Sequence, residues 1–166
     1  MASLAELREV ARYRVIYGDT DQMGVVYYAN YFVWFEVARA DLLRIQGWSY
    51  REMEHSGVSL PVIEAHCEYR QPARYDDEIE IRTMATLLTP VRIRFDYEAW
   101  KAGNTLSATG HTIHAALGPD GRPRRLPSRV LQILPHRCLP VARVASSRRR
   151  CTTTSSASPP RRRSRR

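Results

Sequence analysis

Two carboxylates lie two residues apart in a short polar segment that precedes an aromatic-rich stretch. The segment is bounded by glycines, which predicts a loop, and it reads Gly18-Asp19-Thr20-Asp21-Gln22-Met23-Gly24. An unprotonated carboxylate can attack a carbonyl carbon or remove a proton from water. Asp also commonly stabilises turns in glycine-containing loops. From residue types alone, both a catalytic and a structural role for Asp19 and Asp21 therefore stay open.

A helix is predicted to follow this loop directly. Asn30 opens it, the periodic stretch runs from Tyr31 to about Gln46, and Gly47 ends it. One wide stripe of apolar residues falls at helical spacing, which indicates a helix nearly surrounded by sheet: Tyr31, Trp34, Phe35, Ala38, Leu42 and Ile45. The start of a helix has free backbone N–H groups and a partial positive charge, so it can stabilise an oxyanion beside a carboxylate.

The rest of the chain up to residue 127 shows the alternation by two that is typical of strands. The predicted strands cover residues 12–17, 63–69, 78–87, 91–98 and 105–117, and a short second helix covers residues 49–55. Ala102-Gly103-Asn104 predicts a tight turn between the last two strands. One long helix among consecutive strands indicates an α+β fold with an antiparallel sheet.

The net positive charge of the chain comes from its last 39 residues. The 166 residues carry a formal charge of +9, which is usually a sign of a nucleic-acid partner. Residues 128–166, however, hold eleven arginines and no acid, whereas residues 1–127 hold 15 basic and 17 acidic side chains. We therefore expect one domain over residues 1–127, a disordered Arg/Ser/Pro-rich tail over residues 128–166, and no specific nucleic-acid partner.

The remaining features of the composition exclude several other classes of protein. Cys67, Cys138 and Cys151 are odd in number and lack the spacing of a zinc site or a disulfide framework. His111 and His114 are three residues apart in a predicted strand, so they point to opposite faces and predict no metal site. There is no apolar signal segment and no run long enough to span a membrane, so we expect a cytoplasmic protein without a metal or cofactor.

The loop and the helix start resemble the signature of a known family. The string G-D-T-D-Q-M-G-V-V-Y-Y-A-N-Y-F-V-W-F-E, residues 18–36, resembles the 4-hydroxybenzoyl-CoA thioesterase family of hotdog-fold proteins. It is most similar to the small bacterial acyl-CoA thioesterases associated with the Tol-Pal system. The resemblance continues through four further segments and covers roughly residues 10–127: residues 59–62, 69–77, 110–115 and 121–127. It implies a long central helix wrapped by an antiparallel sheet.

The resemblance also implies roles for individual residues. Asp21, the second aspartate of the D-x-D motif, is the implied catalytic carboxylate, acting as nucleophile or as base for water. The backbone N–H of Tyr28, at the opening of the helix, is implied to hold the thioester oxygen; many Tol-Pal-associated members have His there. Tyr17 and Gly24 flank the aspartates and are implied to contact substrate. The implied partners are an acyl-CoA substrate and further copies of the chain, as a homodimer or tetramer.

Two arginines in a predicted strand are further candidates for substrate binding. Arg92 and Arg94 share one face of a predicted strand, where they can bind the phosphates of coenzyme A or pair with Glu78, Glu80 or Asp96.

One rival function is a dehydratase or hydratase, but no His lies between Gly18 and Tyr31 to act as its catalytic histidine. The other is a non-catalytic module that binds acyl-CoA or docks a partner protein. The acyl group cannot be deduced from the sequence.

Overall fold

The computed structural model describes residues 8–102 and 104–133 of the chain. This part holds five strands: β1 (Arg8–Arg14), β2 (Val62–Tyr69), β3 (Glu78–Thr89), β4 (Arg92–Lys101) and β5 (Thr105–Ala115). Its helical elements are one long helix and three short pieces: α1 (Asn30–Ile45), the 3-10 turn η1 (Tyr17–Asp19), α2 (Tyr50–His55) and α3 (Ser128–Ile133). Among the described helices, none is long and apolar enough to cross a membrane.

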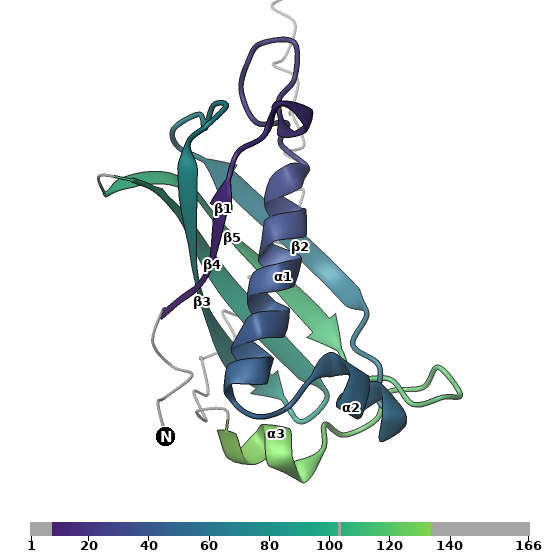
Figure 1. Ribbon diagram of the computed structural model, residues 1–166. Coiled ribbons are helices and arrows are strands. Elements are labelled where there is room, and N and C mark those ends of the chain that lie inside the picture. The colour runs from purple at the N-terminus through teal and green to yellow at the C-terminus, as the bar shows by residue number, and fades with distance from the viewer. Residues whose placement is uncertain (1–7, 103, 134–166) are drawn as a thin grey trace, which may run out of the picture.

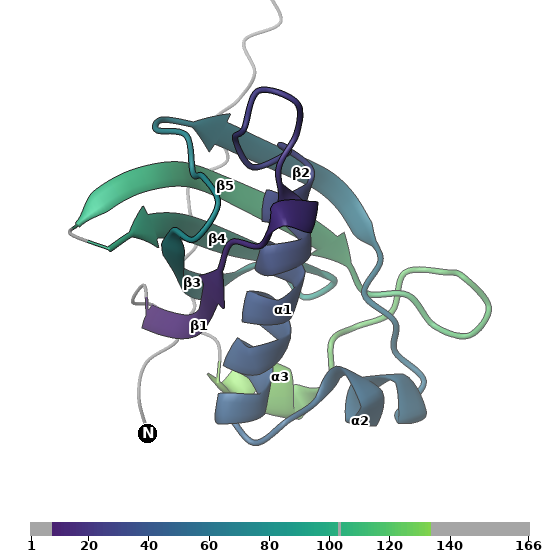
Figure 2. The same ribbon diagram turned by 45° about the horizontal axis from the view of Figure 1, so that its top comes forward.

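The strands form one antiparallel sheet in the order β1-β3-β4-β5-β2. The sheet curves around α1, which lies along its concave face (Figure 1; Figure 2). The chain runs from β1 through α1 to β2 at the opposite edge, and β3, β4 and β5 then follow one another as neighbours. This arrangement confirms the α+β hotdog fold, with a central helix wrapped by an antiparallel sheet.

The core lies between α1 and the inner face of the sheet. Alternate residues of β4 are buried there, because successive side chains of a strand point to opposite faces: Ile93, Phe95, Tyr97 and Ala99. The Phe35 ring of α1 stacks on Tyr97, with the ring centroids 4.4 Å apart. The predicted apolar stripe of α1 is confirmed except at its end, where Leu43 is buried and Ile45 is 61% exposed.

The first strand ends earlier than the predicted range of 12–17. β1 stops at Arg14, and the backbone N–H of Ile16 donates to Asp19 Oδ2 at 3.0 Å. This hydrogen bond turns the chain into η1, so Tyr17 belongs to a turn and its side chain is 73% exposed. Asp19 therefore determines where the strand stops.

The edge strand β2 is held close to the helix at a single glycine. β2 pairs with β5 only, and most of its side chains are exposed. A Cβ on Gly110 of β5 would lie 2.6 Å from the carbonyl oxygen of His66 and 2.7 Å from Cε2 of Phe35. Since real Cβ atoms do not approach so closely, this position requires glycine, and β2, β5 and α1 pack tightly there.

The described fold continues past the predicted boundary at residue 127. α3 follows Pro127, the Val130 side chain is completely buried in the core, and Arg129 donates to the carbonyl oxygen of Gly47 at 2.9 Å. The first residues of the range predicted as a tail therefore form a short helix that packs on the domain. The tail as a whole is poor in apolar residues, but Val130, Leu131 and Ile133 all lie in this first stretch. The rest of the predicted tail, residues 134–166, lies outside the described residues.

Candidate active site

Asp19 stabilises the loop between β1 and α1 and does not reach the cavity described below. Besides the bond from its carboxylate to Ile16, its carbonyl oxygen accepts the backbone N–H of Tyr27 at 2.8 Å and the side-chain amide of Asn30 at 2.9 Å. These bonds connect the start of the loop with the start of α1. Asp19 thus has the structural role that the sequence left open for both aspartates.

Asp21 lies at the tip of the same loop and is only half-buried. Its Oδ1 accepts the backbone N–H of Met23 at 2.8 Å, and its backbone bonds to Val25 and Gly24 close a tight turn. Gly24 has φ +69°, a left-handed conformation that favours glycine. Among the described residues, Asp21 Oδ2 accepts no hydrogen bond. One carboxylate oxygen is therefore held in place while the other is left for a ligand.

Tyr28 precedes α1, which begins two residues later at Asn30 instead of at Tyr28 as the resemblance implied. Its carbonyl oxygen accepts the hydroxyl of Tyr69 at 3.0 Å. Its backbone N–H has no acceptor within the described part of the chain. The free N–H groups and the positive end of the macrodipole of α1 lie in this region. Tyr28 therefore offers a hydrogen-bond donor to a partly negative oxygen.

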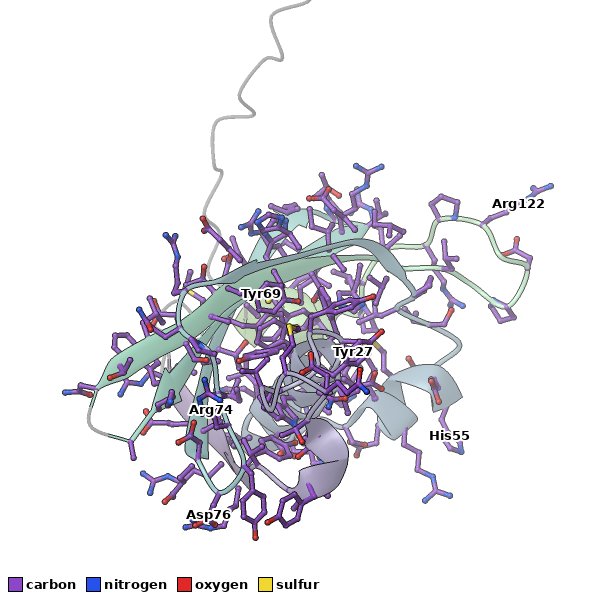
Figure 3. The ribbon with its side chains drawn as sticks, turned by 90° about the horizontal axis from the view of Figure 1, so that it is seen from above. Tyr27, His55, Tyr69, Arg74, Asp76 and Arg122 are labelled. Carbon is purple, nitrogen blue, oxygen red and sulfur yellow. The ribbon has the colours of Figure 1, made fainter. Side chains whose placement is uncertain are left out.

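Asp21 and Tyr28 line the same cavity, which has a volume of about 310 Å³. Residues from the loop, the start of α1 and the end of β2 form its wall: Asp21, Met23, Val25, Val26, Tyr28, Tyr31, Tyr69, Arg70, Gln71 and Pro72. The wall is mainly apolar and aromatic, and Asp21 is its one carboxylate. Figure 3, seen from above, labels Tyr69 of β2 and Tyr27 of the loop near the middle of the view.

Two tyrosines of the wall, Tyr31 and Tyr69, have hydroxyls that do not lose their protons readily. Burial raises the pKa of Tyr31, whose hydroxyl is hydrogen bonded to Ser107 Oγ at 2.9 Å. Burial, followed by its interaction with Cys67, raises the pKa of Tyr69 as well. Both hydroxyls therefore stay neutral at physiological pH. The described wall combines the carboxylate of Asp21, the free backbone N–H of Tyr28, aromatic rings and Arg70, whose guanidinium pairs with Glu68 at 2.6 Å.

Several residues expected to act at the site do not line this cavity. Gly24 shapes the loop but is not part of the wall, and Tyr17 stacks on Tyr75 with the ring centroids 3.8 Å apart. Arg92 and Arg94 lie in β4; the Arg94 side chain is on the outer face of the sheet, where its Nε is 2.8 Å from Asp96 Oδ1. Within one chain, the structure does not bring these arginines to Asp21.

The histidines are likewise placed away from the cavity. His66 and His111 stack on the outer face with their ring centroids 5.3 Å apart, and His111 Nε2 is 2.9 Å from Glu64 Oε1. His114 points inward and is buried, so the predicted opposite orientation of His111 and His114 is confirmed. In the described ranges, no group of His, Cys, Asp and Glu side chains has the arrangement of a metal site.

The sequence analysis missed the contribution of β2 to the site. Tyr69 and the three residues after it were recognised as part of the family resemblance but were given no role. The alternation in residues 63–69 does place Tyr69 on the inner face, which is a usable signal. What alternation does not show is that β2, at the edge of the sheet, passes beside the start of α1.

The chain is similar to several known proteins. Residues 15–134 match the model of the thioesterase-like superfamily. The chain is 34% identical to the acyl-CoA thioester hydrolase YbgC of Escherichia coli, over 71% of this chain and 89% of that protein. It is 35% identical to a 1,4-dihydroxy-2-naphthoyl-CoA hydrolase of Synechococcus elongatus, over 70% and 88%. A crystal structure of a hypothetical protein from Thermus thermophilus superposes with a TM-score of 0.71 at 36% identity, covering 76% of this chain and 97% of that one.

Proposed function

The chain belongs to the thioesterase-like superfamily of thioester hydrolases, and we propose that it hydrolyses acyl-CoA thioesters to a free acid and coenzyme A. The observation that carries the proposal is that Asp21 and Tyr28 share one cavity, in which Asp21 is the only carboxylate among the described residues. The names of the relatives, an acyl-CoA hydrolase and an aryl-CoA hydrolase, support coenzyme A as the carrier. A place in the Tol-Pal system, and action in the cytoplasm, stay predictions.

In the proposed reaction, the thioester carbonyl oxygen accepts the backbone N–H of Tyr28. Negative charge develops on that oxygen when the carbonyl carbon is attacked, and a donor already in place stabilises it. Asp21 either attacks the carbon itself, giving an anhydride that water then cleaves, or removes a proton from the attacking water. In both routes the C–S bond breaks, water supplies the new acid oxygen, and the sulfur leaves as the thiol of coenzyme A after gaining a proton.

We further propose that the chain works as a homodimer or a tetramer of dimers. The supporting observation is the exposed edge strand β2, where Ile63 and Tyr69 are 50% and 46% exposed. A long edge strand of this kind is a template for pairing with a second chain. Because β2 ends at Tyr69 in the wall of the cavity, a partner on this edge would complete the substrate site.

One rival function lacks support from the cavity. A dehydratase or hydratase of this fold needs a histidine near the helix start, and the described wall contains none. A non-catalytic acyl-CoA-binding or partner-docking module is compatible with the same cavity, so it needs an experiment.

The test is thiol release from a panel of short aliphatic, long-chain and aryl acyl-CoA esters. We expect saturable release of coenzyme A with at least one of them, abolished by Asp21→Asn. The matched control is Asp19→Asn, which removes a carboxylate from the same loop but not from the cavity wall. Tight binding of an acyl-CoA without turnover would instead support the binding module.

A further inference from the structure

Two tyrosines form an exposed stack next to the candidate active site. Tyr17 is 73% exposed and Tyr75 is 49% exposed, yet their rings lie parallel within 12°, with centroids 3.8 Å apart. Flat aromatic rings that are held parallel and are partly exposed form a surface on which another flat aromatic ring can stack.

The backbone under the tyrosine pair is firmly fixed. Val15, buried at the end of β1, donates its N–H to Asp77 and accepts the N–H of Asp76, both at 2.9 Å. Asp76 has φ +68°, an uncommon conformation for a residue with a side chain, and Arg14 donates to its carbonyl oxygen at 3.1 Å. The two segments that carry the rings are therefore joined directly, so the stack is built into the fold.

A cation without a carboxylate partner lies beside this pair. The guanidinium of Arg74 donates to the carbonyl oxygen of Gly24 at 3.4 Å, and no carboxylate of the described residues lies within ion-pair distance of it. The nearby acids have partners of their own, Asp77 with Lys101 at 2.8 Å and Asp76 with Arg14 at 3.2 Å. Arg74 is thus left to bind an anion.

Arg74 also connects the pair with the cavity. Its contact Gly24 stands between Met23 and Val25, which both line the cavity, and its neighbour in sequence is Tyr75. Seen from above in Figure 3, Arg74 lies between Tyr69, in the cavity wall, and Asp76, next to the tyrosine pair. Carboxylate, cation and aromatic pair therefore follow one another along this end of the molecule.

We propose that this rim binds the nucleotide end of coenzyme A, with Arg74 on the diphosphate and the adenine stacked on the Tyr17–Tyr75 pair. A guanidinium matches the geometry of phosphate oxygens, and an adenine ring stacks on aromatic side chains. The order of the groups matches that of the substrate, in which the diphosphate separates the adenine from the thioester arm. Arg92 and Arg94, the arginines that the sequence suggested for the phosphates, lie in β4 away from this rim. The inference rests on the proposed thioesterase function.

The experiment compares two substrates that carry the same acyl group, one on coenzyme A and one on N-acetylcysteamine, which lacks the nucleotide. For Arg74→Gln, we expect the ratio of kcat/KM for the two substrates to fall about tenfold, through KM for the coenzyme A ester. Tyr17→Leu should lower the ratio several-fold, whereas Tyr17→Phe should keep it because the ring remains. Arg44→Gln, an exposed arginine paired with Asp41 at the far end of α1, is the matched control.

Two results would overturn the inference. One is an unchanged ratio in both Arg74→Gln and Tyr17→Leu; the other is an equal loss on both substrates, which would mean that the rim only supports the fold. If wild type cleaves neither ester, the proposed function fails, and calorimetry with coenzyme A then tests the rim. In that case Arg74→Gln must weaken binding about tenfold relative to wild type, and equal binding would refute the site.

Discussion

On the outer face of the sheet, His66, Arg94 and His111 line a hollow of about 520 Å³, which is larger than the cavity beside Asp21. Its polar groups have partners close by: Arg94 Nη2 is 2.6 Å from Asp96 Oδ1, and His111 Nε2 is 2.9 Å from Glu64 Oε1. In the cavity beside α1, by contrast, Asp21 has only a backbone partner, and the N–H of Tyr28 has no acceptor among the described residues. Size and residue type alone would favour the outer hollow over the proposed active site.

The two hollows differ in how many of their polar groups already have a partner. Side chains that satisfy one another across a strand have little left to offer a ligand. A carboxylate held by one oxygen, next to an unpaired backbone donor, still has bonding capacity. The five predictions below test this contrast, beginning with the largest effect.

Removing the charge of Asp21 should have the largest effect. Asp21→Asn keeps the size of the side chain and can keep the bond to the N–H of Met23, so folding should change little. Turnover should fall by about 10²-fold or more, equivalent to about 3 kcal/mol of transition-state stabilisation. Thiol-release rates and thermal melts check this. Wild-type turnover in a normally folded Asp21→Asn chain would show that the carboxylate is not catalytic.

Removing the backbone N–H of Tyr28 should reduce turnover almost as strongly. Tyr28→Pro removes the N–H and should reduce kcat by about 10²-fold, the usual cost of losing one oxyanion donor. Tyr28→Phe keeps the N–H and should retain most of the activity. Steady-state rates on both variants, with melting curves to exclude unfolding, provide the measurement. Equal activity of the proline variant would assign the oxyanion donor to another group.

The two histidines of β5 lie on opposite faces of the sheet, so their variants allow the pH dependence of stability to be compared between the two faces. His114 is buried and hydrogen bonded to the carbonyl of Leu60 at 2.9 Å and to Thr112 Oγ1 at 3.0 Å, and burial lowers its pKa to about 4. The unfolded chain binds a proton near pH 6.5 and the folded chain does not, so stability is full above that pH and falls towards pH 4. The loss should reach about 3 kcal/mol.

Urea unfolding between pH 7.5 and 4.5 measures this loss. His114→Asn should flatten the curve relative to wild type, even though the variant is less stable at neutral pH. His111→Asn, the matched change on the outer face of the same strand, leaves His114 in place and should keep the fall in stability that the burial of His114 causes. If the two variants behave alike, burial of His114 is not the origin of the pH dependence.

The packing of α3 on the domain predicts that a chain without this helix is less stable. A chain ending at Pro127 loses the buried Val130 side chain, which should lower the free energy of unfolding by about 2 kcal/mol relative to a chain ending at Ile133. Chemical denaturation of both chains gives the comparison. Identical midpoints would mean that α3 adds nothing and that the predicted boundary at residue 127 was adequate.

The smallest effect is expected on the outer face. Arg94→Gln removes a surface ion pair with Asp96, worth at most about 1 kcal/mol, and should change kcat/KM for an acyl-CoA by less than about twofold. Substrate titrations of the variant and wild type suffice. A clear rise in KM would restore the original expectation that Arg92 and Arg94 bind the phosphates, through a neighbouring copy of the chain.

The sequence predicted the parts of the fold that depend on periodicity. The apolar stripe that includes Trp34 and Phe35 defined the helix, and alternation defined the central strands. It did not predict the end of β1, because that depends on one hydrogen bond from Ile16 to Asp19. The docking of Val130 was also missed, since composition describes an average over 39 residues and one buried valine hardly changes it.

At the site, the sequence was most informative where residues adjoin in the chain. Asp21 and Tyr28 lie in one continuous motif, and the structure places both on one cavity. Tyr69 and Arg74 come from a segment about fifty residues away, and no periodicity shows which end of the helix that segment passes. Long-range placement of this kind is decided by strand order, here by β2 pairing with β5 at the sheet edge.

The close packing around Gly110 limits which amino-acid substitutions this protein can accept. His66 and Phe35 leave no room for even a methyl group there, so alanine would push the edge strand away from the helix. The same strand ends in Tyr69, whose hydroxyl holds the carbonyl of Tyr28. A library of variants selected for new acyl substrates should therefore accept almost nothing at Gly110, although this position carries no side chain and does not line the cavity.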